Sequence, residues 1–118
     1  MTTILPRFNF TNMIYRYMRV VVFIDLPVTT NQNRREYRAF RKHLIKSGFL
    51  MVQESVYSKL VANDTMAKYV IENIRSRRPS AGTVQILQVT EKQYSRMEYI
   101  VGEKNSEILD SDERLVII

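Results

Sequence analysis

The chain has 118 residues, which is enough for one domain with a modest hydrophobic core and too few for two. Its 45% hydrophobic and 25% charged residues argue against gross disorder, and the lack of cysteine excludes disulfides and thiolate metal sites. The net charge of +6 favours a polyanionic partner, and no apolar run approaches the roughly 20 residues that span a bilayer, so we expect a cytoplasmic protein without membrane contact.

The charge is unevenly distributed along the chain. Residues 19–78 hold twelve Lys or Arg against five Asp or Glu, whereas residues 91–113 hold three against seven. This pattern predicts a basic body that binds a polyanion, followed by an acidic arm with a different contact. Charge alone leaves open the alternative of solvated faces without a partner.

The first clear element is a strand at 19–27. Residues 1–17 show no periodicity, and we expect a leader that is disordered or absent from the native protein. Five consecutive apolar residues, Val20 to Ile24, predict a strand that is buried on both faces. Asp25 follows where this strand should reach water, and Pro27 marks its end.

A helix is expected next, capped by Thr30 or Asn31 and ending near Ser47 and Gly48. At 100° per residue, Tyr37, Phe40 and Leu44 form its apolar stripe. Basic residues gather on one flank beside this stripe, where their mutual repulsion costs stability unless something negative offsets it. They are Arg34, Arg35, Arg38, Arg41, Lys42 and Lys46.

The middle of the chain predicts more strands and a second helix. Residues 49–61 indicate either two short strands joined by a tight turn or one bent strand with a bulge. A helix then runs from Asn63 or Asp64 to about Arg77, with Met66, Val70 and Ile74 as its buried stripe. Cations at its C-terminal end suit the helix dipole, and they are Arg75, Arg77 and Arg78.

The last part of the chain begins with a strand over 83–90 and a helical turn over 91–94, and 97–101 is expected to be extended again. The chain closes on four apolar residues, 115–118, which implies a sheet edge that they pair with. This order predicts an α+β, ferredoxin-like βαββαβ domain over 18–101, followed by a C-terminal arm over 102–118. Since two helices cover one sheet face, we expect a second copy to cover the other face in a homodimer.

Three segments together resemble a known family. They are the apolar strand ending in Asp25, the arginine-rich helix opening with Asn33, Arg34 and Arg35, and the stretch 53–57 (QESVY). They resemble the small CRISPR-associated adaptation protein Cas-two, the second of the Cas series. The string DLPVTTNQNRREYRAFRKHLIKSGF and the tail DERLVII resemble its type II-A branch.

The resemblance implies a ferredoxin-like homodimer that bridges two dimers of the spacer integrase, the first of the Cas series, during insertion of DNA fragments into a CRISPR array. Some relatives are described as magnesium-dependent nucleases that cut RNA or double-stranded DNA. In those relatives the metal ligand is the aspartate that ends the first strand, which corresponds to Asp25. A toxin-like ribonuclease of the same fold is a further alternative.

The residues themselves leave the role of Asp25 open between a loop acceptor for nearby amides and a catalytic metal ligand. One carboxylate is a thin magnesium site, so the ion would have to be shared by Asp25 of two protomers. His43, the single histidine, is expected to be a surface or boundary residue.

For the cations we expect sequence-independent contact with phosphates of double-stranded DNA, because the planar guanidinium suits phosphate oxygens. The first set comprises Arg34, Arg35, Arg38, Arg41 and Lys42, and the second comprises Arg75, Arg77 and Arg78. The tail residues Arg114, Leu115, Val116, Ile117 and Ile118 are expected to add a strand to a sheet edge of this chain, its sister copy or the integrase.

Overall fold

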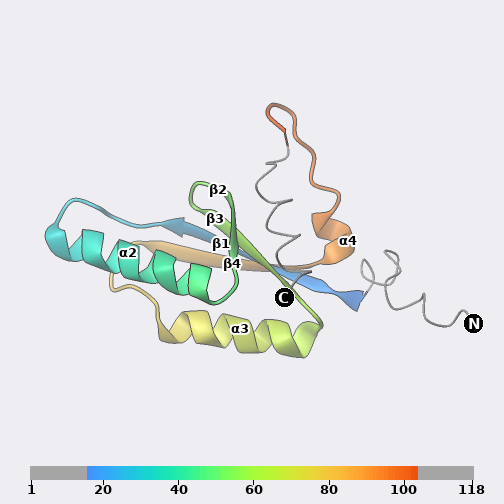
Figure 1. Ribbon diagram of the computed structural model, residues 1–118, viewed down its shortest axis with the longest axis horizontal. Helices are drawn as coiled ribbons and strands as arrows, with labels where there is room; N and C mark the ends of the chain where they lie inside the picture. Colours follow the sequence, from blue (N-terminus) through green and yellow to red (C-terminus); the bar gives the residue numbers. More distant parts are fainter. Residues whose placement is uncertain (1–15, 104–118) are drawn as a thin grey trace, which may run out of the picture.

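A four-stranded antiparallel sheet organises the computed structural model, which describes residues 16–103 (Figure 1). The strands are β1 (Met18–Asp25), β2 (Leu50–Gln53), β3 (Val56–Val61) and β4 (Thr83–Thr90), in the spatial order β2-β3-β1-β4. The helices are α2 (Asn31–Lys46), α3 (Asp64–Ser76) and the single turn α4 (Glu91–Tyr94). The predicted ferredoxin-like α+β arrangement is confirmed.

Both long helices begin and end where their capping residues predict. The Thr30 hydroxyl accepts a 3.0 Å hydrogen bond from the Asn33 amide at the start of α2. Gly48, with a φ of 95°, follows the end of that helix. The Asn63 side chain accepts a 2.9 Å bond from the Met66 amide at the start of α3. These bonds satisfy amide groups that the first helical turn leaves without a partner.

The core lies between the sheet and the two long helices. Val20, Val22 and Ile24 of β1 point into it, and α2 contributes Phe40 and Leu44 as its stripe predicts. In α3 the buried residues are Ala67, Val70 and Ile74. The prediction that Met66 is buried is wrong, since 44% of Met66 is exposed. The small Ala67 side chain, one position further along, is the one that faces the sheet closely.

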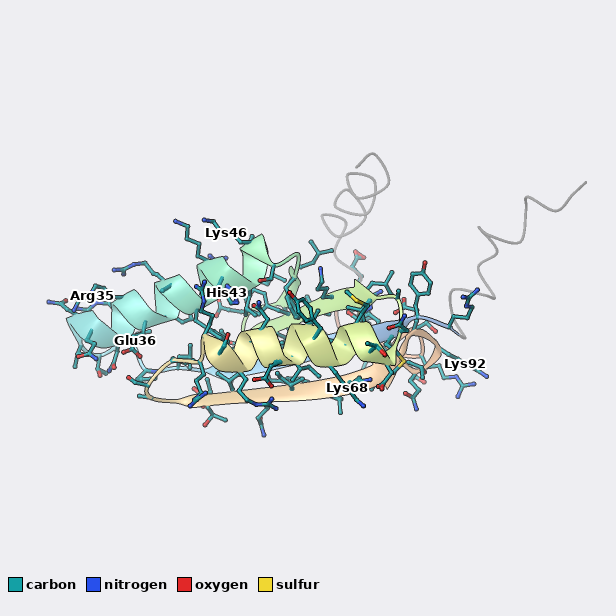
Figure 2. All side chains as sticks on the ribbon, turned by 90° about the horizontal axis from the view of Figure 1, so that it is seen from below. Arg35, Glu36, His43, Lys46, Lys68 and Lys92 are labelled. Atoms are coloured by element: carbon teal, nitrogen blue, oxygen red, sulfur yellow. The ribbon has the colours of Figure 1, made fainter. Side chains whose placement is uncertain are left out.

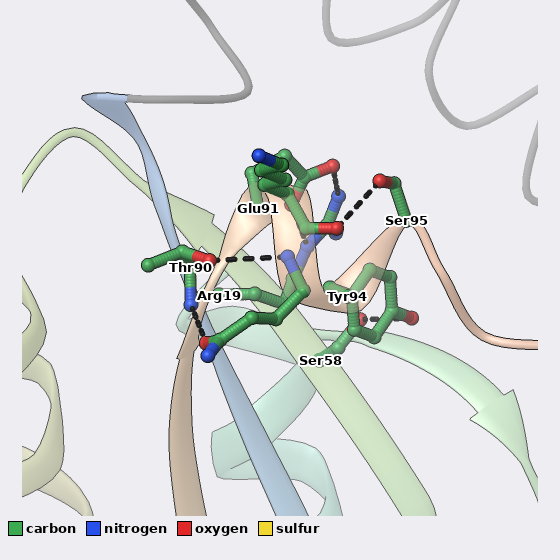
Figure 3. A network of polar contacts seen from close by, with 8 residues as sticks. Arg19, Ser58, Thr90, Glu91, Tyr94 and Ser95 are labelled. Carbon is green, nitrogen blue, oxygen red and sulfur yellow. Dashed lines mark hydrogen bonds and ion pairs between the residues drawn. The ribbon is translucent and has the colours of Figure 1, made fainter.

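The opposite side of the sheet, which we call the open face, carries the alternate residues of each strand. Val21 of β1 is buried there, because α4 folds over this face and the Tyr94 hydroxyl bonds to Ser58 of β3 (Figure 3). Further along, Phe23 is 38% and Leu87 of β4 is 51% exposed. The prediction that β1 is buried on both faces is therefore wrong for Phe23 within a single chain.

Two further predictions are decided by the backbone. Residues 50–61 form two strands joined by a tight turn at Glu54 and Ser55, which is the first of the two alternatives, and the pairing is irregular between Met51 and Gln53. The predicted extended segment at 97–101 is wrong, because no strand forms there.

Most of the leader and the tail residues 114–118 lie outside the described residues. No helix between residues 16 and 103 is long and apolar enough to cross a membrane.

Candidate nucleic-acid interface

The first set of predicted phosphate contacts forms one surface of α2, which we call the α2 basic flank: Arg34, Arg35, Arg38, Arg41 and Lys42. Three of these residues, Arg38, Arg41 and Lys42, line a groove of about 510 Å³ between α2 and the β2–β3 hairpin. Met51 and the buried Tyr57 form part of the opposite wall. The flank thus lies toward the β2 edge of the sheet.

The residues of the α2 basic flank differ in what holds them. Arg41 Nε donates a 2.9 Å hydrogen bond to the Tyr57 hydroxyl, and Arg34 donates to the Val28 carbonyl at 2.9 Å and to the Asn31 side chain. These partners are neutral, so both guanidinium groups keep their full charge. The remaining members, Arg35, Arg38 and Lys42, make no ion pair or hydrogen bond through their side chains with any residue between 16 and 103.

The second set of cations lies at the C-terminal end of α3 and does not merge with the flank. Arg75 pairs with Glu72, and Arg78 Nη1 donates to the Arg75 carbonyl at 2.9 Å. Arg75 and Arg78 line a groove of about 390 Å³ beside Val84 of β4. Because β4 and β2 are opposite edges of the sheet, the grooves that the two sets of cations line are separate.

The other side of α2 faces α3 and carries none of the flank residues. A groove of about 580 Å³ between α2 and α3 is lined by Glu36 and His43 on one side and by Arg77 and Arg78 on the other. Figure 2 shows Glu36 and His43 on the side of α2 that faces α3, while Lys46 points away from it. His43 Nε2 lies 2.8 Å from Asn73 Oδ1 of α3, and the residue is half-buried, as expected for a boundary histidine.

Glu36 is the acidic residue of the groove between α2 and α3, which Arg77 and Arg78 also line. Its carboxylate accepts a 2.9 Å bond from the Ser80 amide, bonds of 2.8 and 2.9 Å from the Ser80 hydroxyl, and a 3.2 Å bond from Gln32. Hydrogen bonds from the Ser80 amide, then from Gln32 and the Ser80 hydroxyl, lower the pKa of Glu36. Glu36 therefore stays ionised while bonding to neutral groups rather than to the neighbouring arginines.

Asp25 lies at the exposed end of β1 on the open face, paired with Thr83 of β4. No residue between 16 and 103 bonds to its carboxylate, so the loop-acceptor role is not observed within that range. The same range contains no cluster of three His, Cys, Asp or Glu residues that could hold a metal. Because Mg²⁺ requires near-octahedral oxygen coordination, one chain does not provide a magnesium site by these residues alone.

Two structural partners went unrecognised in the sequence. The sequence pattern singles out neither Glu36 nor Ser80. Their contact spans 44 positions, and no periodicity or motif signals a bond of that kind. The one hint in the sequence was that Glu36 is the single acidic residue of a helix that carries six Lys or Arg residues.

Comparison with known proteins decides the family. The model of the family described as CRISPR associated protein Cas2 matches residues 18–97. This chain belongs to that family. A Cas2 relative from Treponema denticola is 55% identical over 101 residues, which cover 86% of this chain and all of the relative. A second, from Ligilactobacillus salivarius, is 46% identical with the same coverage, and both are named CRISPR-associated endoribonuclease Cas2.

A solved Cas2 structure has the same fold. It superposes with a TM-score of 0.53 at 21% sequence identity, covering 76% of this chain and 92% of the other. At this identity the likeness concerns the fold alone. The family membership places the chain in a CRISPR system and agrees with the resemblance drawn from its strand, helix and hairpin residues.

Proposed function

We propose that this protein acts in CRISPR adaptation as a dimeric bridge between dimers of the spacer integrase, holding duplex DNA by its phosphates. The observation that carries the proposal is the α2 basic flank. Arg35 and Arg38 are exposed, and no acid between residues 16 and 103 neutralises them. Such an arrangement repels itself, and a polyanion relieves the repulsion.

The contact is with phosphates and not with base edges. Base recognition requires side chains fixed at the floor of a groove, whereas Arg35, Arg38 and Lys42 have no described contact that fixes their position. Cations of this kind follow the DNA backbone and carry no sequence information. Integration of fragments of arbitrary sequence requires such sequence-independent contacts.

The dimer in this proposal forms through the open face. Phe23 and Leu87 expose apolar surface there, and a second copy is the occupant that would cover both at once. β4 is an edge strand among the strands described for residues 16–103, so it suits the addition of the tail strand 114–118 from the sister copy or the integrase. Deleting residues 114–118 should weaken assembly and leave the described domain folded.

The direct test measures affinity for a blunt duplex as a function of salt. Each phosphate neutralised contributes about 0.9 to the slope of log affinity against log salt, so Arg35→Ala/Arg38→Ala should reduce the slope by about 1.8 for each protomer that contacts the duplex. Lys68→Ala/Arg96→Ala removes the same charge from other exposed positions and should leave the slope nearly unchanged. Equal slopes for the two double variants, or a flat salt dependence of the unaltered protein, would contradict the proposal.

A second candidate is a magnesium-dependent endonuclease, favoured by the name endoribonuclease given to the relatives and by the carboxylate of Asp25, to which no residue between 16 and 103 bonds. It requires the dimer, since only two copies would bring two such carboxylates together. Asp25→Asn keeps the size of the side chain and removes its charge. If the protein is a nuclease, this change abolishes magnesium-dependent cleavage of single-stranded RNA or duplex DNA; if it is a bridge alone, spacer acquisition survives the change.

A further inference from the structure

The loop between α3 and β4, residues 77–82, carries two of the cations assigned to DNA. Arg77 and Arg78 are exposed. On the α3 side the Arg77 and Arg78 amides continue helical bonding to the Ile74 and Arg75 carbonyls. What holds the loop against α2 decides where these two guanidinium groups stand relative to the α2 basic flank.

Two kinds of contact join the loop to α2 and to the segment that follows β1. Pro79 and Ala81 border a small cavity with Leu26 and Tyr37, which gives an apolar contact. The polar contact is made by Ser80, whose amide and hydroxyl both donate to Glu36, at 2.8 to 2.9 Å. Charge-assisted bonds of this length are about twice as strong as neutral ones.

Glu36 is electrostatically out of place on a surface for a polyanion. A carboxylate beside Arg35 and Arg77 lowers the local positive potential and by Coulomb's law alone weakens phosphate binding. Its oxygens, however, are engaged by Ser80 and Gln32, and no ion pair to an arginine is formed within residues 16–103. The carboxylate thus serves the position of the loop.

We propose that Glu36 and Ser80 form a clamp that holds Arg77 and Arg78 in place on the α3-facing side of α2, where they contact duplex phosphates in addition to those bound by the α2 basic flank. The inference rests on the proposed DNA-binding function and adds Glu36 as a positioning residue that acts through Ser80. The clamp orders the loop before DNA arrives, and the bound duplex then does not have to supply the cost of ordering it.

Charge and position predict opposite results when Glu36 is neutralised, and this makes the clamp testable. Glu36→Gln removes a negative charge from the basic region, which alone would tighten DNA binding. The clamp predicts weaker binding, because the loop cations lose their position. Glu54→Gln is the matched control, since Glu54 lines the groove with Arg38 and has no described bond to lose. Ser80→Ala removes the donating hydroxyl, and Ser80→Thr restores it.

Two measurements on the full chain distinguish the effect of the clamp on the loop from its effect on DNA binding. Without DNA, hydrogen exchange of the Ser80 amide, followed by NMR, should be faster in Glu36→Gln and unchanged in Glu54→Gln and Ser80→Thr. With a blunt duplex between about 50 and 200 mM salt, Glu36→Gln should bind about tenfold more weakly than Glu54→Gln, with a salt slope lower by between about 1 and 2. The affinity of Ser80→Ala for the duplex should lie between those of Glu36→Gln and Glu54→Gln. Ser80→Thr should bind the duplex as tightly as the unaltered protein does.

Three outcomes would overturn the inference in distinguishable ways. Unchanged exchange of the Ser80 amide in Glu36→Gln means that the clamp does not hold the loop. Faster exchange with binding as tight as that of Glu54→Gln means that the clamp exists and does not serve DNA. Absence of DNA binding by the unaltered protein removes the proposed function itself, and the positioning role with it, whatever the exchange shows.

Discussion

Arg19 and Glu91 form a two-pronged ion pair on the open face of the sheet, although 72 positions separate them. Arg19 Nε donates to Glu91 Oε1 and Arg19 Nη2 to Oε2, each at 2.8 Å. The same guanidinium lies 4.4 Å from the centre of the Tyr94 ring, and the Tyr94 hydroxyl is 3.2 Å from Ser58 Oγ (Figure 3). The network fastens α4 to β1 and β3 and sets where the chain leaves the sheet.

Glu91→Gln should lower the free energy of unfolding by about 2–3 kcal/mol, because it leaves a largely desolvated guanidinium without its charged partner. Urea unfolding measures the change. Glu98→Gln removes the same charge from an exposed position and should stay within about 0.5 kcal/mol of the unaltered protein. Equal stability of the two variants would mean that the ion pair contributes nothing.

Gly82→Ala should destabilise the fold beside Asp25. Gly82 has a φ of 91°, and an added Cβ would lie 2.8 Å from the Asp25 carbonyl oxygen and 2.9 Å from side-chain atoms of Leu26 and Pro27. We expect the free energy of unfolding, measured by thermal unfolding, to fall by about 1–3 kcal/mol.

Gly102→Ala separates crowding from backbone strain in this experiment. Gly102 has a similar φ of 93°, and no atom of residues 16–103 lies within 4 Å of its added Cβ. It should cost at most about 1–2 kcal/mol, the penalty of the left-handed conformation alone. If both alanine variants lose equal stability, the packing of Gly82 against Asp25 does not matter.

Leu87→Glu should prevent self-association through the open face. Leu87 is 51% exposed, and burying a carboxylate there against a second copy costs free energy. We expect dimerisation to weaken by at least about 100-fold, measured by sedimentation equilibrium. Met66→Glu, at a 44% exposed position on α3, is the control and should dimerise normally. Identical behaviour of the two variants would place the interface elsewhere.

Acid should release the loop at Ser80. The Ser80 amide, Gln32 and the Ser80 hydroxyl lower the pKa of Glu36 below its ordinary value of 4.5, so the bonds to the carboxylate are fully present above pH 4.5. They are lost as the pH falls through the lowered pKa of the folded protein. Exchange or chemical shift of the Ser80 amide against pH measures this step. Glu36→Gln should abolish it, and persistence of the step in that variant would assign it to another group.

Much of the fold follows from residues that lie within a turn of one another. Thr30 and Asn63 cap helices because their side chains reach amides three positions ahead, and α2 buries Phe40 and Leu44 because apolar residues recur at helical spacing. Such features need no knowledge of the rest of the chain. The same local reasoning failed at Met66, where two neighbouring stripes fit the helical period and only the sheet selects between them.

The candidate interface divides in the same way. That Arg35 and Arg38 share one side of a helix was determined by their spacing alone, because the helical period is a property of the backbone. Tertiary structure alone decided which groove this side faces and how far apart the two basic surfaces lie. It also decided the bonds from Ser80 to Glu36 and from Arg19 to Glu91. They join residues 44 and 72 positions apart, and such residues meet only after the strand order β2-β3-β1-β4 brings their elements together.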